Sequence, residues 1–494
     1  MRHVDPVVRG LGSLLVLCLL LPAQTLTRGP SVWEHGPTSF LVAFQTSSQV
    51  QGQIDWGPTE ALGNTTNGNT TNDHAIHITG LQPDHFYWYR VLLQGVPVTP
   101  IHRTRTFASA TSTPAGSDVT FFVFGDCGNG SADQIRVANL VHSWDWDLGL
   151  LPGDIIYPDG QASGFDPYFF TPYGQTLRST PFYPVLGNHD NHTSSGHPYL
   201  DAFHLPSSNS DTERWYSFDH GNVHFIGLDS NQKTSPRQTT WLRNDLMAAR
   251  SNNAQWIFVT FHHPAYSSGA VHGRDQTVYQ NWCPIFEEFE VDAVFTGHDH
   301  IYERTTVRRD FYPNNRGVVY YVAGTGGAGL YGINQQPYSA YAVSKHGALK
   351  VDVRGNVFHS VFLDGSPGTL GQQLDPYSMV RGPVTPGLRA ASPSPQPGQS
   401  FDGAFDGPNG AYRVLFAALQ SDYAQVPGLG LVHLGAPNTI LASGMIGSTQ
   451  TEAFSLAVPN QPALVDTRLF FQGLTLNAPS SSMQLTDLVH ARVR

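Results

Sequence analysis

The sequence has few charged residues, and basic residues are the minority among them. Charged side chains make up 13 % of the 494 residues, about half of the usual share, with 27 basic residues against 38 acidic ones. The formal net charge of −11 excludes a general affinity for nucleic acid, because no basic field is available to displace counterions from its phosphates. We therefore expect no nucleic acid among the partners.

Cysteine is also scarce, with three residues in the whole chain. So few thiols exclude a disulfide scaffold, in which several bridges take the place of a large hydrophobic core. Cys18 lies in an N-terminal apolar run, so Cys127 and Cys283 are the two that remain in the rest of the chain. Whether these two pair is left open, because the sequence does not give the distance between them.

Long apolar runs are missing beyond the N-terminus. Arg2 and Arg9 precede an apolar run over residues 11–21, which is followed by Pro-Ala and a polar stretch. This order is typical of a secretory signal peptide, and the run is too short to span a bilayer comfortably. We expect a signal peptide over residues 1–29 and a secreted protein, extracellular or periplasmic, with no membrane contact beyond export. A single uncleaved anchor is the alternative.

Glycine (49), proline (35) and histidine (22) are plentiful instead. Together with 40 % apolar residues, they indicate several folded domains that are rich in loops and strands. The histidines bear most directly on function, because histidine is the commonest metal ligand and titrates near neutral pH. We predict a multidomain protein with one α/β region between two β regions.

The first region, residues 30–110, consists of short segments in which apolar and polar residues alternate, separated by Gly, Asn and Pro. This pattern predicts an antiparallel β-sandwich. Residues 81–90 (Leu-Gln-Pro-Asp-His-Phe-Tyr-Trp-Tyr-Arg) resemble a turn and strand of fibronectin type III modules. Asn64 and Asn69 each begin an Asn-Thr-Thr triplet, which is either a glycosylation acceptor or part of a polar loop.

The second region, residues 118–381, alternates apolar strands with helical stretches near 132–144, 239–250 and 277–289. Strand and helix in repeated succession predict a layered α/β domain, in which ligands bind at the carboxyl ends of the strands.

A Pro- and Ser-rich linker over residues 382–400 separates a third region, residues 401–494, whose apolar runs predict a small β-sandwich-like module. This module resembles C-terminal β modules of secreted bacterial proteins. We expect it to contact a cell surface or matrix rather than to take part in chemistry.

Five polar blocks in the central region each follow an apolar run. They read Gly-Asp-Cys-Gly at 125–128, Gly-Asp-Ile-Ile-Tyr at 153–157, Gly-Asn-His-Asp at 187–190, His-His-Pro at 262–264 and Gly-His-Asp-His at 297–300. Glycine allows a sharp turn off a strand, and Asp, Asn and His suit ions such as Fe, Mn and Zn. One block alone is typical of a solvated turn, but five in succession predict a shared metal site.

The five blocks resemble the signature of binuclear metallophosphoesterases, and Tyr157, four residues after Gly153, makes them similar to purple acid phosphatases. The last block continues as Ile-Tyr-Glu-Arg to residue 304, which is also close to that family. The sequence departs from the family pattern at Cys127, His263 and Asp299, none of which removes a ligand. The resemblance implies a calcineurin-like α/β/β/α domain, preceded by the fibronectin-like module that plant members also have.

The resemblance also implies a set of metal ligands, shared between Fe(III) and a divalent Fe, Zn or Mn ion. Fe(III) would be bound by Asp126, Tyr157, His300 and one oxygen of Asp154. The divalent ion would be bound by Asn188, His262, His298 and the other oxygen of Asp154. A bridging carboxylate suits two metals about 3.5–4 Å apart, and a phenolate ligand stabilises Fe(III) and gives the family its colour.

The implied activity is the hydrolysis of phosphate esters by an acid phosphatase, with a metal-bound hydroxide attacking phosphorus in line. A general acid must then protonate the leaving oxygen, and His189 and His272 are the two candidates. Alternatively, both imidazoles only hydrogen-bond to carbonyl groups. Asn188, His189 and His263 are expected to contact substrate, and His192 and His197 lie in a polar loop near them.

Two alternatives remain at this point. The same metal centre serves a phosphodiesterase or nucleotide hydrolase if the loops at 161–174 and 194–211 leave room for a second substituent. A non-catalytic surface-binding protein is the other alternative, but such a relic should have lost ligands, and all seven are present.

Overall fold

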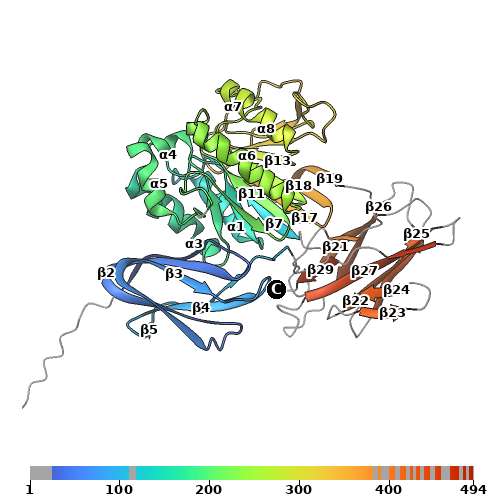
Figure 1. Ribbon diagram of the computed structural model, residues 1–494, viewed down its shortest axis with the longest axis horizontal. Helices are drawn as coiled ribbons and strands as arrows, with labels where there is room; N and C mark the ends of the chain where they lie inside the picture. Colours follow the sequence, from blue (N-terminus) through green and yellow to red (C-terminus); the bar gives the residue numbers. More distant parts are fainter. Residues whose placement is uncertain are drawn as a thin grey trace, which may run out of the picture.

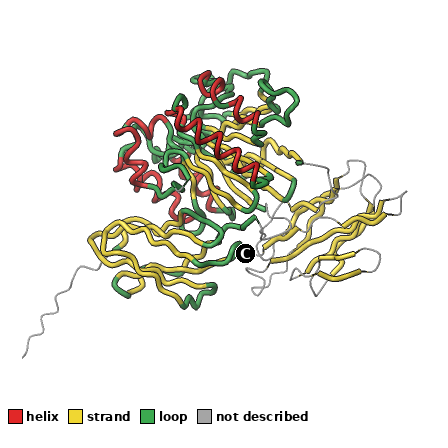
Figure 2. The backbone as a smooth tube through the Cα atoms, in the orientation of Figure 1, coloured by secondary structure: helices red, strands yellow, loops and turns green. Residues whose placement is uncertain are grey.

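The computed structural model describes residues 25–110, 118–207 and 209–381, together with the backbone of the strands between Leu388 and Arg492 (Figure 1). In Figure 2 the strands of the central region lie among helices, whereas the N-terminal region is built from strands and loops. No helix within the described ranges is both long and apolar enough to cross a membrane.

The N-terminal region is a six-stranded antiparallel sheet. Its strands are β1 (Leu26–Trp33), β2 (Ser39–Gly57), β3 (Asn64–Thr79), β4 (Phe86–Leu93), β5 (Val96–Pro97) and β6 (His102–Arg105). The long strand β2 pairs with β1, β3 and β4, and both of its faces are buried over residues 40–44: Phe40, Val42 and Phe44 lie in the core of the N-terminal region, while Leu41 and Ala43 lie in the core shared with the central region. A β-rich N-terminal region is therefore confirmed, while its assignment as a fibronectin type III module stays a prediction. The region begins earlier than residue 30, because β1 starts at Leu26.

The central region contains two mixed sheets. The first sheet has the order β19-β18-β17-β7-β8-β9, and the second has the order β10-β11-β12-β13-β15-β14-β16. The strands of the first are β7 (Val119–Val123), β8 (Leu148–Leu151), β9 (Phe182–Pro184), β17 (Gly347–Arg354), β18 (Val357–Asp364) and β19 (Gln373–Val380). Those of the second are β10 (Tyr216–His220), β11 (Val223–Gly227), β12 (Trp256–Thr260), β13 (Ala293–Thr296), β14 (Tyr302–Thr305), β15 (Val319–Ala323) and β16 (Ser339–Val343).

Aromatic side chains join the two sheets face to face. Phe121 of β7 meets Phe225, Phe258 and Phe295, on β11, β12 and β13, with ring centroids 5.4, 5.6 and 5.8 Å apart. All four rings are buried, and such contacts add to the free energy gained from burying apolar area. Strands β7, β8 and β9 run parallel to one another, as do β11, β12, β13 and β15. Each set therefore presents its carboxyl ends along one edge of its sheet.

The helices of the central region match the sequence-based prediction in part. They are α1 (Ala132–His142), α2 (Ala162–Phe165), α3 (Thr171–Leu177), α4 (Asn188–His192), α5 (His197–Ala202), α6 (Pro236–Ser251), α7 (Gln276–Asn281) and α8 (Cys283–Glu288), with a π-turn at Asp166–Phe170 and 3₁₀ turns at Ser194–Gly196 and Ser230–Gln232. The helices predicted near 132–144 and 239–250 are confirmed as α1 and α6, which Ser131 and Ser235 cap by accepting the amide hydrogens of Gln134 and Gln238.

The helix predicted over residues 277–289 is instead two short helices, α7 and α8. Pro284 lies in the first turn of α8, where its missing N–H is tolerated, but it cannot continue the hydrogen-bond pattern of α7. Cys283 at this break and Cys127 beside β7 are both buried and free, so they do not pair.

Beyond residue 387 the structure describes only strands. They are β20 (Leu388–Ala390), β21 (Ser400–Asp406), β22 (Tyr412–Ala418), β23 (Tyr423–Val426), β24 (Gly430–His433), β25 (Thr439–Met445), β26 (Thr451–Ala457), β27 (Arg468–Asn477), β28 (Ser482–Leu485) and β29 (Val489–Arg492). Their antiparallel pairing agrees with a β-rich segment. The boundaries of a separate module, most of the linker at 382–400 and the signal peptide at 1–24 lie outside the described residues.

Candidate metal centre

All seven predicted ligands lie at the carboxyl ends of parallel strands. They follow β7 (Asp126), β8 (Asp154 and Tyr157), β9 (Asn188), β12 (His262) and β13 (His298 and His300). The face-to-face packing of the two sheets therefore brings together residues that lie up to 174 positions apart in the sequence. Asp126 and His262 are fully buried, and Asp154 is 2 % exposed.

Three of the predicted ligands have backbone conformations that are unusual for residues other than glycine. Asp126, Asp154 and His298 have φ angles of 58°, 51° and 72°, in the left-handed region that non-glycine residues rarely adopt. Such strain persists where the surrounding structure enforces it, and functional sites are the usual places. Two glycines leave space for the ligands, since a Cβ atom at Gly187 would lie 2.0 Å from Asp154 Oδ1 and one at Gly297 would lie 2.4 Å from Asp126 Oδ2.

One group of donor atoms surrounds the hydroxyl oxygen of Tyr157, and we call it the tyrosine set. This oxygen lies 3.2 Å from Asp126 Oδ1, 3.1 Å from Asp154 Oδ2 and 3.2 Å from His300 Nε2. His300 Nε2 is also 3.4 Å from Asp126 Oδ1. Burial and the two carboxylates raise the pKa of the Tyr157 phenol far above its ordinary value. A cation at this point is what would favour the phenolate.

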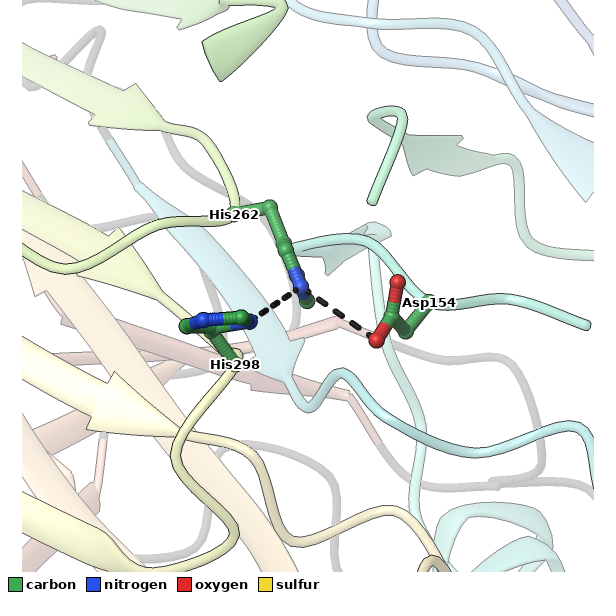
Figure 3. A group of neighbouring side chains, drawn as sticks. All are labelled: Asp154, His262 and His298. Atoms are coloured by element: carbon green, nitrogen blue, oxygen red, sulfur yellow. Dashed lines mark hydrogen bonds and ion pairs between the residues drawn. The ribbon is translucent and has the colours of Figure 1, made fainter. Parts of the chain in front are cut away.

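The second group, the asparagine set, surrounds His262 Nε2 (Figure 3). This nitrogen is 3.0 Å from Asn188 Oδ1, 3.1 Å from His298 Nδ1 and 3.3 Å from Asp154 Oδ2. Asp154, His262 and His298 each offer one donor atom within 4.8 Å of the others. Two nitrogens and two oxygens of this kind form a borderline donor set that suits Zn, Mn or Fe.

Asp154 belongs to both sets through a single oxygen. Its Oδ2 atom faces Tyr157 and His262, while its Oδ1 atom accepts a hydrogen bond of 2.9 Å from the backbone N–H of His189. The expectation that each oxygen serves one metal stays a prediction. Oδ2 is the oxygen that lies against both donor sets, and Oδ1 keeps acceptor capacity beside its hydrogen bond from residue 189, so Asp154 would contribute to holding both ions.

Backbone carbonyls fix which nitrogen of each ligand imidazole faces the site. His262 Nδ1 lies 2.8 Å from Pro152 O, and His300 Nδ1 lies 2.6 Å from Gly329 O. Because a carbonyl oxygen only accepts, each Nδ1 carries a proton, and each Nε2 is the nitrogen that faces the donor set. This arrangement is typical of metal-binding histidines. The residues present thus fit a pair of metal ions.

The charges at the site support the same conclusion. Burial alone would lower the pKa of His262, but the carboxylate of Asp154 raises it to about 9. Burial would likewise raise the pKa of Asp154, which His262 instead holds below its usual range. Burial and the neighbouring His262 and His263 lower the pKa of His298. These shifts show that the buried carboxylate favours a positive charge beside it, which a metal ion would supply.

The two predicted acid candidates lie on different sides of the donor sets. His189 is 32 % exposed, its ring centroid is 4.5 Å from that of Tyr157, and its Nδ1 donates to Pro158 O, so Nε2 faces the donor sets, 3.9 Å from Asp154 Oδ2. The exposed ring of His272 stacks on that of His298, with centroids 4.0 Å apart and an interplanar angle of 28°. The structure thus brings both to the rim of the metal centre.

Three further histidines of the predicted site, His263, His192 and His197, belong to neither donor set. His263 Nδ1 lies 2.8 Å from Ser230 Oγ, and burial and the neighbouring His262 lower its pKa to about 3, so a neutral ring forms part of the wall beside His298. His192 is exposed and lies 5.2 Å from His189, ring to ring. His197 begins α5 and is exposed.

Two supporting residues were missed by the sequence analysis. The buried carboxylate of Asp190 accepts hydrogen bonds from the backbone N–H groups of Ile155, Ile156 and Gly187, and so joins the loops after β8 and β9. Asp190 is the last residue of the polar block at 187–190, and this position could have indicated a role at the site. Tyr331 stacks on His300 with centroids 4.0 Å apart, and only its position after a glycine-rich stretch hinted at this role.

Two sheets with two sets of metal-binding side chains at their carboxyl edges define a metallophosphoesterase-like domain. Residues 119–302 match the family model described as calcineurin-like phosphoesterase. Purple acid phosphatase 15 of Arabidopsis thaliana is 29 % identical over 289 residues, covering 51 % of this chain and 53 % of that protein. A purple acid phosphatase of Glycine max is 30 % identical over 252 residues, covering 47 % and 52 %. The chain thus spans about half the length of these two relatives.

The fold agrees with these relatives. Purple acid phosphatase PPD1 from yellow lupin (Lupinus luteus) seeds has a similar solved structure, with a TM-score of 0.63 at 17 % identity over 72 % of this chain and 75 % of that one. Residues 119–302 therefore form a calcineurin-like phosphoesterase domain, and the chain is similar in sequence and fold to purple acid phosphatases.

Proposed function

We propose that the protein is a secreted acid phosphatase that hydrolyses phosphate esters with a binuclear centre of Fe(III) and a divalent Fe, Zn or Mn ion. The observation behind this proposal is the single oxygen of Asp154 that lies against both donor sets, 3.1 Å from Tyr157 Oη and 3.3 Å from His262 Nε2. Two metals bound there would neutralise phosphate oxygens and acidify a water molecule for attack on phosphorus.

The protein's own residues supply the remaining functions. Asp126, Asp154, Asn188 and the three predicted ligand histidines would hold the ions, with Tyr157 as a further ligand in the tyrosine set. His189 holds one proton on Nδ1 through Pro158 O, so its Nε2 is oriented to exchange a proton with the leaving oxygen or to bind the phosphate. His272 lies on the other side of His298 and is the second candidate for that proton.

The proposal is tested with purified protein, 4-nitrophenyl phosphate as the monoester and bis(4-nitrophenyl) phosphate as the diester. We expect hydrolysis that chelation abolishes and that Fe with Zn or Mn restores. Asp126→Asn, purified in the same way, controls for a contaminating phosphatase and should be inactive. A higher kcat/KM for the diester would assign a phosphodiesterase instead. Activity that survives both chelation and Asp126→Asn would contradict the proposal.

Export is part of the same proposal. The support is the order of charged, apolar and small residues over residues 1–23, and cleavage after Ala23 would leave β1, which begins at Leu26, complete. N-terminal sequencing of protein recovered from outside the cytoplasm should find a start between residues 24 and 30. Secreted protein that still begins with Met1 would contradict a cleaved signal.

A further inference from the structure

Asp299 stands between two metal ligands, at a position where the sequence departs from the family pattern. Its carboxylate is fully buried, although the side chain belongs to neither donor set. Its Oδ2 atom lies 2.6 Å from Ser267 Oγ and 2.8 Å from the backbone nitrogen of Gly273. Its Oδ1 atom accepts the backbone N–H of His272 at 3.2 Å. All three donors come from one loop, residues 267–273.

A second acidic side chain of the same block secures the beginning of that loop. Glu303, also fully buried, accepts hydrogen bonds from the backbone N–H of Ser268 at 2.6 Å and from its hydroxyl at 2.7 Å. The approach is close, because a Cβ atom at Gly269 would lie 2.1 Å from the carboxyl carbon of Asp299. The 267–273 loop is therefore tied at both ends to the segment that contains His298 and His300.

The loop brings one functional group to the metal centre, the imidazole of His272. Within the described ranges neither ring nitrogen of His272 has a hydrogen-bond partner, and its ring contacts His298 at 4.0 Å and Tyr331 at 5.7 Å between centroids, so it is placed by these rings and by its own backbone. The backbone N–H that Asp299 accepts is that of His272 itself. The position of this imidazole relative to the metal ligands therefore depends on Asp299.

We propose that Asp299 is a positioning residue that holds His272 beside His298, where His272 donates a proton to the leaving oxygen of the substrate. This role rests on the proposed function. A carboxylate has free lone pairs for two N–H groups and a hydroxyl, whereas an amide of the same shape turns an NH₂ group toward at least one of these donors. Loss of that hydrogen bond would release the loop, and small displacements of a catalytic group are costly to rate.

The test compares Asp299→Asn, His272→Ala and the double variant. A general acid matters most when the leaving group is weakly acidic. We therefore expect Asp299→Asn to lower kcat about 10–100-fold for an alkyl phosphate, to change kcat little for 4-nitrophenyl phosphate, and to leave KM unchanged. The double variant should be no slower than His272→Ala, because both substitutions remove the same function.

Glu287→Gln is the matched control. Glu287 is also a fully buried carboxylate that holds a loop, since it accepts the backbone N–H groups of Asp310, Phe311 and Tyr312 at 2.8 Å each. Residues 310–312 include no predicted metal ligand and no candidate acid. Glu287→Gln should therefore lower the free energy of unfolding, while kcat should depend on the leaving group as it does in the wild type.

Hydrogen exchange supplies a readout that does not depend on turnover. Asp299→Asn should speed exchange of the amides in 267–273 and leave those in 310–312 unchanged, and Glu287→Gln should do the reverse. Both variants should keep the metal content of the wild type. Unchanged exchange in 267–273, loss of metal in Asp299→Asn, or additive effects in the double variant would overturn the role of Asp299. A wild-type protein without esterase activity would instead overturn the proposed function, and with it the catalytic part of this role.

Discussion

Asp154 is the side chain on which both donor sets depend. One of its oxygens faces Tyr157 and His262, and the other is held by the backbone of His189. The remaining ligands each belong to one set, so their removal should affect one ion more than the other. Metal content should therefore distinguish Asp154, which belongs to both sets, from the ligands that belong to one.

Asp154→Ala should therefore be more damaging than Asn188→Ala. We expect the first variant to lose both metals and the second to lose mainly the divalent ion. Substitution of a residue that only supports a metal ligand typically lowers activity about 10–100-fold. We expect both variants to lower kcat by more than this, because each removes a ligand. Metal analysis of the purified variants checks this prediction. Two metals per chain in Asp154→Ala, with near-normal turnover, would contradict the shared oxygen.

Tyr157→Phe tests the ferric part of the proposal. The substitution removes only the hydroxyl oxygen, so the fold should survive while the visible absorption from phenolate-to-iron charge transfer disappears. Turnover should persist in part, because the cations do not depend on the phenolate for their charge. Tyr331→Phe is the control, since Tyr331 stacks on His300 but its oxygen belongs to neither set. A colourless wild type, or a coloured Tyr157→Phe variant, would contradict the assignment.

The seven donor residues could be predicted from the sequence, but their geometry could not. An Asp, Asn or His directly after an apolar run is a local signal, preceded by glycine in four of the five blocks, and it marked the strand ends at which these residues lie. The shared Oδ2 of Asp154 and the carbonyls of Pro152 and Gly329 depend on contacts between segments far apart in the sequence. No local pattern contains those distances.

At the scale of helices and strands, the hydrophobic pattern was informative where an element was long. Helices α1 and α6 were predicted, but α2, α3 and α5 were not, because each has fewer than eight residues and proline lies in the first turn of α3 and α5. Short elements of this kind are stabilised by tertiary packing rather than by their own periodicity.

One contact between elements predicts a pH dependence of stability. His224 of β11 lies 2.6 Å from Asp219 of β10 and 2.9 Å from Asp245 of α6. Burial alone would lower its pKa, but these two carboxylates raise it from 6.5 to about 9. The folded state therefore holds a proton that the unfolded state releases, and this stabilisation is complete below pH 6.5 and lost as pH rises toward 9.

His224→Gln cannot titrate and should remove this dependence. We expect the free energy of unfolding of the wild type, relative to the variant, to fall by about 1–2 kcal/mol between pH 6.5 and pH 9, because water screens the exposed Asp219. Urea unfolding at several pH values measures the difference. A difference that stays constant or grows with pH would contradict the charged pair.

At the scale of the whole molecule, all seven predicted ligands lie in the central region, at the ends of strands in its two sheets. Every donor residue lies between Asp126 and His300, and the first sheet ends with β19 at Val380. Arg381, just beyond β19, forms an ion pair with Asp292. The N-terminal sheet contacts this region through buried rings such as Trp33 and Phe203, with centroids 5.6 Å apart.

A chain that ends after Gly382 should therefore keep the activity of the full chain. We expect kcat and metal content to stay within about twofold, because the truncation removes no residue of the site or of the two sheets. Steady-state kinetics on both proteins checks this, with circular dichroism to confirm folding. A folded, metal-loaded but inactive truncation would show that residues 383–494 contribute to the site.

The proposed function requires these residues to hold two metal ions side by side. Anomalous diffraction from crystals of the metal-loaded protein tests it most directly. We predict two peaks about 3.5–4 Å apart, one among Asp126, Tyr157 and His300 and the other among Asn188, His262 and His298, with Asp154 between them. A single peak, or metal bound away from these side chains, would contradict the account.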